Sequence, residues 1–135
     1  MGGLDEACRG VVARVDGAVA CAVIDLDTGF VLGVHSASAL NLELTELMAR
    51  ATLNLLRGPD VTAIEREIRK TRGEKETGEH YLQELQLTSE HHLHFAVVLK
   101  GGRVVMMLVT RRTTSVGLGW AQLRAAVAGV EALVP

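Results

Sequence analysis

The sequence predicts a single α+β domain, in which helices flank a sheet. Three observations support this prediction. The apolar run at 18–24 does not alternate with polar residues, as expected of a strand buried on both faces, and Asp27-Thr28-Gly29 beyond it is typical of a tight turn. Apolar residues then recur at helical spacing over 39–57. Three strand-like segments and a last helical segment follow.

Composition limits the size and class of the protein. The 135 residues, 48% of them hydrophobic, suffice for one core and one domain, 1–135. A formal net charge of -2 and 3% aromatic residues argue against a nucleic-acid partner. With no basic leader and no apolar run near the ~20 residues that span a bilayer, we expect a cytoplasmic protein without membrane insertion. Cys8 and Cys21 are expected to be free and structural.

The first half of the chain contains a helix, a hairpin and a long helix. Apolar residues at helical spacing predict the first helix, which Asp16-Gly17 ends; they are Leu4, Cys8, Val11 and Val15. The hairpin strands are expected at 18–26 and 30–35. Ser36-Ala37-Ser38 then offers caps for the long helix at 39–57.

Two apolar stripes lie on nearly opposite sides of this long helix. The first consists of Leu40, Leu44, Leu47, Met48, Ala51 and Leu55, and the second of Leu42, Ala49, Leu53 and Leu56. One stripe can pack on the sheet. The second would then leave leucines in water, which is best explained by a copy of the same helix across a two-fold axis. The alternative is that a later segment of the chain covers it.

A short helix and a charged connector follow. Gly58-Pro59 ends the long helix, and Asp60 is expected to cap a short helix in which Val61, Ile64 and Ile68 share a face. Acidic and basic residues alternate over 65–76, which indicates a solvated face. We expect the connector at 71–79 to project into solvent with little order.

Three strands and a final helix complete the domain. The strands are expected at 80–88, 92–99 and 103–110, with Gly101-Gly102 in the last hairpin. The first is the most polar and suits an exposed sheet edge, which charge can protect or a partner strand can extend. Ser115 can cap the final helix, whose apolar stripe includes Trp120.

Candidate sites for chemistry are weak. In His91-His92-Leu93-His94, the second and third histidines share a strand face in a spacing compatible with a metal, with His80 or Glu90 as a third ligand. Three histidines near a turn are more often solvated surface groups. Asp27-Thr28-Gly29 resembles the half-site of a dimeric aspartic protease, yet the helical segments do not suit that all-β fold. We therefore predict a non-enzymatic protein with no catalytic, metal or cofactor site.

The chain resembles the Roadblock/dynein light-chain family over nearly its whole length. The segment at 15–29, the Leu-rich helix and the Ser115-Val-Gly-Leu-Gly-Trp-Ala-Gln-Leu-Arg sequence resemble it most. The resemblance implies a profilin-like α/β sandwich: a five-stranded antiparallel sheet flanked by helices. It also implies a homodimer in which the long helices and edge strands meet. Such proteins act as platforms for Ras-like small GTPases or accompany sensor kinases. The charged segment at 71–79 departs from the shortest members of the family and makes this chain resemble a bacterial member.

Together these observations predict a homodimeric scaffold that binds a Ras-like small GTPase or a sensor-kinase-linked assembly. The predicted dimer interface consists of Leu42, Ala49, Leu53, Leu56, Leu82, Glu84, Gln86 and Thr88. The alternative is a small-molecule-sensing profilin-like domain, which would have a cavity between sheet and helix.

Overall fold

The computed structural model describes residues 2–39 and 41–135. The elements are α1 (Gly2–Arg14), β1 (Ala18–Asp25), β2 (Val31–Ser36), α2 (Leu42–Arg57), α3 (Pro59–Arg72), β3 (Glu84–Thr88), β4 (His92–Leu99), β5 (Val104–Arg111) and α4 (Val116–Leu133). All five strands form one antiparallel sheet in the order β2-β1-β5-β4-β3. The predicted α+β architecture is confirmed. Leu40, which the sequence analysis placed on the first stripe of the long helix, lies outside the described residues.

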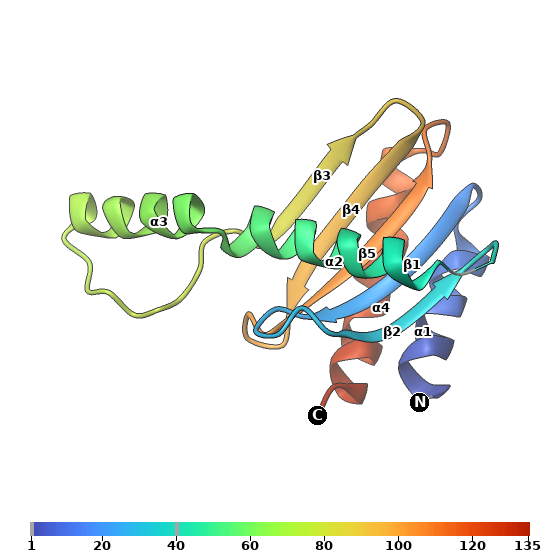
Figure 1. Ribbon diagram of the computed structural model, residues 1–135, viewed down its shortest axis with the longest axis horizontal. Helices are drawn as coiled ribbons and strands as arrows, with labels where there is room; N and C mark the ends of the chain where they lie inside the picture. Colours follow the sequence, from blue (N-terminus) through green and yellow to red (C-terminus); the bar gives the residue numbers. More distant parts are fainter. Residues whose placement is uncertain (1, 40) are drawn as a thin grey trace.

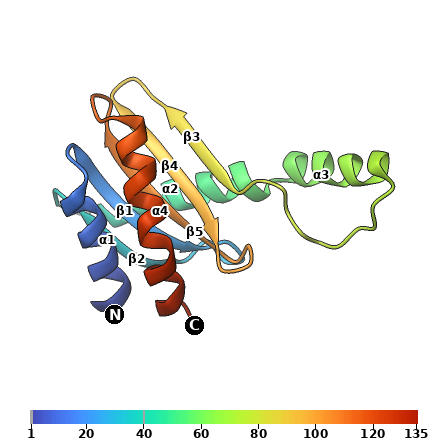
Figure 2. The ribbon, with the colours of Figure 1, turned by 180° about the vertical axis from the view of Figure 1, so that it is seen from behind.

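The helices cover the sheet on both faces. Helices α1 and α4 lie on one face and α2 on the other (Figures 1 and 2). The core under α1 and α4 includes Phe95 and Leu123, and the core under α2 includes Leu56 and Val105; all four are fully buried. Strand β5 lies in the middle of the sheet and is buried on both faces. Its apolar run is therefore continuous rather than alternating.

Local sequence signals account for several of the element boundaries. Asp25 Oδ1 accepts hydrogen bonds from the backbone N–H groups of Asp27 and Thr28 at 2.7 and 3.2 Å, so the Asp-Thr-Gly sequence forms a turn. Ser115 caps α4 as predicted, by accepting a hydrogen bond from the N–H of Leu118 at 3.3 Å. Helix α2 begins later than predicted, because Asn41 rather than the preceding serines caps it.

Helix α3 projects away from the sheet. Gly58 ends α2, and Pro59 occupies the first turn of α3, so the predicted cap at Asp60 is wrong. We call α3 the arm: it continues roughly in the line of α2 and extends past β3, and the connector, residues 73–83, returns from its tip (Figure 1). Within the described part of the chain, every helix is too short or too polar to cross a membrane.

Candidate interaction surface

Helix α2 packs on the sheet through its second apolar stripe, which corrects the predicted interface. Ala49 and Leu56 are fully buried, and Leu53 packs on the same core. Thr52 donates a hydrogen bond to Sδ of Met107 at 3.2 Å. Ala49 and Leu56 therefore cannot lie at a dimer interface. Helical spacing alone did not distinguish the two apolar stripes; the small side chains of Ala49 and Thr52 fit the close contact with the sheet.

The first stripe of α2 faces solvent instead. Leu44, Leu47 and Leu55 are 53%, 50% and 45% exposed, and Ala51 is exposed beside them. We call these residues the α2 stripe. Leu42, from the predicted interface, is also exposed, but it lies in the first turn and outside this stripe. A row of exposed leucines on one helix is typical of a protein–protein contact.

Strand β3 is an edge strand, as predicted. It is the last strand in the sheet, so one of its sides has no neighbour in the described chain. Its register places Glu84, Gln86 and Thr88 on the face that carries α4, and Glu84 accepts two hydrogen bonds from Arg124 at 2.7 and 2.9 Å. The strand begins at residue 84 and not at 80. Leu82 therefore lies in the connector, where it packs on the core under α2.

Two apolar depressions lie beside α2 on its face of the sheet. One, of about 520 Å³, lies between the first half of α2 and strands β1, β2 and β5. The other, of about 400 Å³, lies between α2 and β3. The residues common to both are Met48, Ser89, His94 and Met107. We call this continuous depression the α2 groove. Ala20 and Ala22 line it from β1, where their small side chains leave the space open.

Two of the histidines considered above as metal ligands, His92 and His94, line the same groove. His94 Nε2 lies 3.1 Å from Oγ of Ser89, and burial, with a smaller contribution from His92, lowers the pKa of His94. His91 is exposed and contacts Glu90 at 3.8 Å. Residues 2–39 and 41–135 contain no cluster of three or more His, Cys, Asp or Glu side chains that could hold a metal ion. His92 and His94 contribute polar groups to a mainly apolar groove, which several serine and threonine residues also line.

An ion-pair network joins the arm to the connector. Glu65 and Arg69 are only 3% and 5% exposed, although they lie on a helix that projects from the sheet. Glu65 Oε1 lies 2.7 Å from Nδ1 of His80, and Glu65 Oε2 accepts the backbone N–H of Tyr81. Arg69 pairs with Glu76 at 3.0 Å, and its guanidinium lies 4.6 Å from the centre of the Tyr81 ring. One face of the arm is thus covered by the connector.

The sequence analysis missed this network. Alternating charges at 65–76 indicated a solvated face, yet two of these residues are buried. His80, the partner of Glu65, lies 15 positions away, and Glu76, the partner of Arg69, lies beyond the end of the helix, so no helical spacing rule relates them. The connector therefore has a defined path along the arm, and the mobility predicted for 71–79 stays a prediction.

The network also sets the charge state of Glu65. Burial acts to raise the pKa of this carboxyl group. The hydrogen bonds from His80 and Tyr81 and the charges of His80 and Arg57 outweigh burial, so the pKa of Glu65 lies below its ordinary value. Ionised Glu65 is the form that holds the connector.

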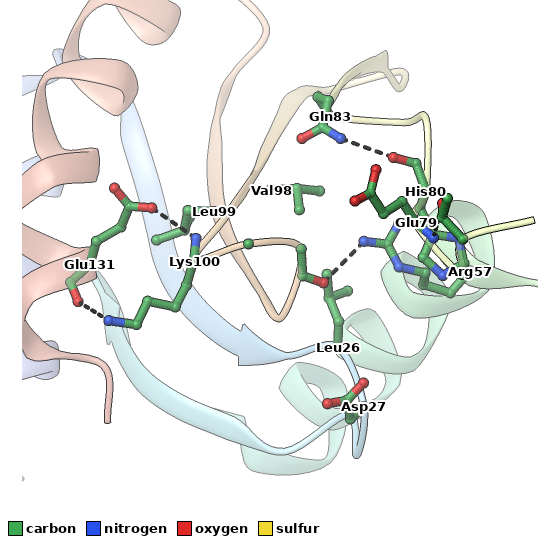
Figure 3. Close-up of a pocket in the computed structure, with 14 residues that line it drawn as sticks. Leu26, Asp27, Arg57, Glu79, His80, Gln83, Val98, Leu99, Lys100 and Glu131 are labelled. Carbon is green, nitrogen blue, oxygen red and sulfur yellow. Dashed lines mark hydrogen bonds between the residues drawn. The ribbon is translucent and has the colours of Figure 1, made fainter. Parts of the chain in front are cut away.

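A polar cleft of about 790 Å³ lies where the arm joins the body of the protein (Figure 3). Arg57 donates a hydrogen bond to the carbonyl of Gly102 at 3.1 Å, and burial lowers the pKa of Arg57 although Glu65 and Asp27 act to raise it. Across the cleft, the N–H of Lys100 donates to a carboxylate oxygen of Glu131 at 2.8 Å. The first bond ties the end of α2, from which the arm extends, to the β4–β5 turn, and the second ties α4 to the same turn.

The comparisons with known proteins establish the fold. No family model and no curated protein matches the sequence. Solved structures do match. Myxococcus xanthus MglB is 18% identical, with a TM-score of 0.70 over 96% of this chain and 93% of that chain. A Roadblock/LC7 domain from Streptomyces avermitilis is 19% identical, with a TM-score of 0.69 over 96% of both chains.

A third structure, described as MglB with tetrameric arrangement, is 19% identical, with a TM-score of 0.71 over 95% of this chain and 85% of that chain. Likeness at such identities establishes the fold alone. The chain has the Roadblock/LC7 fold over nearly its whole length, as the resemblance in its sequence implied.

Proposed function

We propose that this protein is a cytoplasmic, non-enzymatic homodimer that presents a composite surface to a Ras-like small GTPase or a related signalling assembly. The observation that supports this most is the α2 stripe, whose three leucines are about half exposed on one face of a sheet that ends in the free edge of β3. A row of exposed apolar side chains on one helix is suited to binding another protein.

The proposed dimer uses β3 and the α2 stripe together. Pairing β3 with its copy about a two-fold axis perpendicular to the sheet would extend the five strands into one larger antiparallel sheet. The same axis places both α2 helices on one face of that sheet, with their C-terminal ends toward the axis. The proposed interface is therefore Leu44, Leu47, Ala51 and Leu55, with Glu84, Gln86 and Thr88 at the strand edge. This set keeps the predicted strand and replaces the predicted helix residues.

The Roadblock fold supports the proposed class of partner. The family that the sequence resembles provides platforms for small GTPases, and a fold neighbour is described in a tetrameric arrangement. Two copies side by side form a surface that one copy does not have, so binding of a GTPase would depend on the dimer. The partner would hold the nucleotide, and this chain would supply the shape and charge of the docking surface.

A single substitution tests the dimer. Leu47→Asp places a charge in the middle of the α2 stripe and should convert the dimer to monomer, as measured by sedimentation velocity. Arg50→Asp also adds an acidic group to an exposed position of α2, but beside the stripe, and should remain dimeric. Unchanged helix content by circular dichroism would show that Leu47→Asp still folds. A wild-type monomer at micromolar concentration would contradict the proposal.

The partner is tested by capture from extract of the native cells. Wild-type protein is incubated with GDP or a non-hydrolysable GTP analogue, and the bound proteins are identified by mass spectrometry. We expect a Ras-like GTPase in one nucleotide state, bound by wild type and Arg50→Asp but not by Leu47→Asp. Reproducible absence of any GTPase would contradict the proposed partner while leaving the dimer intact.

A further inference from the structure

We propose that the arm of one copy packs in the α2 groove of its partner. This inference rests on the proposed homodimer and adds a second contact to it, in which each chain contributes a helix to the other. Two surfaces that a single chain leaves uncovered carry the inference: the apolar face of the arm and the groove beside α2.

The arm has an apolar face that its own chain does not cover. Ile64 and Ile68 are 58% and 36% exposed, four positions apart and therefore on the same side of the helix. The buried network with the connector involves Glu65 and Arg69, which lie around the helix from the isoleucines. Ile64, Ile68 and Ala63 also line a shallow hollow on the arm's outer surface. The connector thus holds the arm from one side and leaves its apolar side free.

The α2 groove is the matching surface on the body of the protein. Its floor follows one row across the sheet, because the register pairs Leu87 with His94, His94 with Val109, and Val109 with Ala20. The row lies toward one end of each strand, near the ends of β3 and β5 and the starts of β4 and β1, and its residues line the two depressions beside α2. This floor is only partly covered, since Leu87 is 41% exposed and Ala20 and His94 are half-buried, although Val109 is buried. Apolar surface left open beside exposed leucines is unfavourable in water. The groove extends across several strands and is mainly apolar, so it can receive a helix that presents isoleucine side chains.

The two-fold axis beside β3 brings the arm and the groove together. The arm extends past β3 in the line of α2, beyond the limit of its own sheet (Figures 1 and 2). The axis places the partner's sheet in that position, with its α2 face on the same side. A 14-residue helix is about 21 Å long, which spans roughly four strands at the usual spacing. The arm can therefore reach from the edge strand to β1 of the partner.

A second copy explains both surfaces at once, whereas a small molecule explains only the groove. The arm and the groove occur once in each chain, so a symmetric exchange covers every copy of both. A ligand in the groove would leave Ile64 and Ile68 in water. The arm's defined shape, held by the buried Glu65 and Arg69, also lowers the entropy lost when it docks.

Disulfide trapping between two differently tagged chains tests the contact. One chain carries Ile68→Cys, and the other carries Ala20→Cys, Ala22→Cys or Ser36→Cys along the groove. The native Cys8 and Cys21 are buried and leave the background low. Mild oxidation with oxidised glutathione should give a covalent heterodimer for at least one groove position, by thiol–disulfide exchange that releases reduced glutathione. Ala125→Cys, exposed on α4 at the opposite face, is the matched control and should give none.

The outcomes separate this inference from the proposed dimer. A dimer by sedimentation that traps at none of the groove positions overturns the arm exchange and leaves the dimer standing. A wild-type monomer overturns both. A small molecule retained in the native protein, detected by native mass spectrometry and lost on unfolding, would assign the groove to a ligand and overturn the arm exchange.

A second variant measures how much the arm contributes to dimerisation. The double substitution Ile64→Asp/Ile68→Asp should weaken the dimer at least tenfold in Kd, because it places two charges in an apolar groove. Lys70→Asp is exposed on the same helix, away from the isoleucines, and should change Kd less than threefold. Equal effects of the two variants would contradict the inference.

Discussion

Arg57 Nη2 donates a hydrogen bond to the carbonyl oxygen of Gly102 at 3.1 Å, joining the end of α2 to the turn between β4 and β5. The bond lies at the base of the arm, where the chain leaves the sheet. Helix α3 begins at Pro59, two residues after Arg57, so this bond anchors the point from which the arm extends, while the contacts of Glu65 and Arg69 with the connector hold the arm farther out. The core and the proposed interaction surface therefore meet at this residue.

Adjacent leucines on α2 should differ strongly in their effect on stability. Leu56 is fully buried and Leu55 is 45% exposed. Leu56→Ala should lower the free energy of unfolding by about 2–5 kcal/mol through lost burial and a cavity, whereas Leu55→Ala should change it by less than about 1 kcal/mol. Urea denaturation of both variants in the Leu47→Asp background removes the contribution of dimerisation. Equal losses of unfolding free energy in the two variants would contradict an orientation of α2 in which Leu56 faces the sheet and Leu55 faces solvent.

Two glycines of α4 should respond to alanine in opposite directions. A Cβ atom at Gly119 would lie 2.5 Å from Cζ of Phe95, which is fully buried and packs edge-on against Trp120 at 5.3 Å. Gly119→Ala should therefore destabilise the fold by about 1–3 kcal/mol. At Gly129 nothing lies within 4 Å of the added Cβ, so Gly129→Ala should stabilise the helix by roughly 0.5–1 kcal/mol. Thermal unfolding of the two variants checks both signs.

The two cysteines should be inert in the folded protein. Cys8 and Cys21 are buried at 0% and 1% exposure, and the hydrogen bond between the two thiols, burial and the charge of a Cys8 thiolate raise the pKa of Cys21 well above its ordinary value. Thiolate is the reactive form, so a colorimetric thiol reagent should label neither cysteine in buffer at pH 8 and both in urea. Rapid labelling of the native protein would contradict the packing of α1 on β1.

Acid should release the connector from the arm. The pKa of Glu65 is lowered in the folded protein, so its contribution is complete above the unfolded-state value of about 4.3 and is lost as the pH falls through the folded value. Glu65→Gln should increase amide exchange at Tyr81 about 10- to 100-fold at pH 7, because a buried charged hydrogen bond contributes about 1.5–3 kcal/mol.

Hydrogen exchange at a series of pH values, corrected for intrinsic rates, measures this effect. Wild-type protein should approach the Glu65→Gln variant only below about pH 4. Glu67→Gln, exposed on the same helix, is the control and should leave exchange at Tyr81 unchanged. Identical exchange in wild type and Glu65→Gln at pH 7 would contradict a structural role for the carboxylate.

The interaction surface was only partly predictable. The polar sequence of 84–88 indicated an edge strand, because only a strand exposed on one side tolerates that composition. The orientation of α2 was not predictable, because its two stripes are nearly equal in apolar character. The helical spacing of 100° per residue shows which residues share a stripe, but it does not show which stripe packs on the sheet. The burial of Glu65 and Arg69 was not predictable either. Their partners lie in the connector, and whether the connector contacts the arm depends on the path of the chain.

The sequence by itself determined the α+β order of elements, the turn after β1, the cap at Ser115 and the resemblance to Roadblock proteins. Each depends on interactions between residues close in the sequence, or on the repeat of two residues in a strand and 3.6 residues in a helix. The tertiary structure alone decided which face of α2 is buried, where the arm points and which charges are removed from water. These depend on contacts between residues far apart in the chain, where shape complementarity selects among arrangements that the local pattern permits equally.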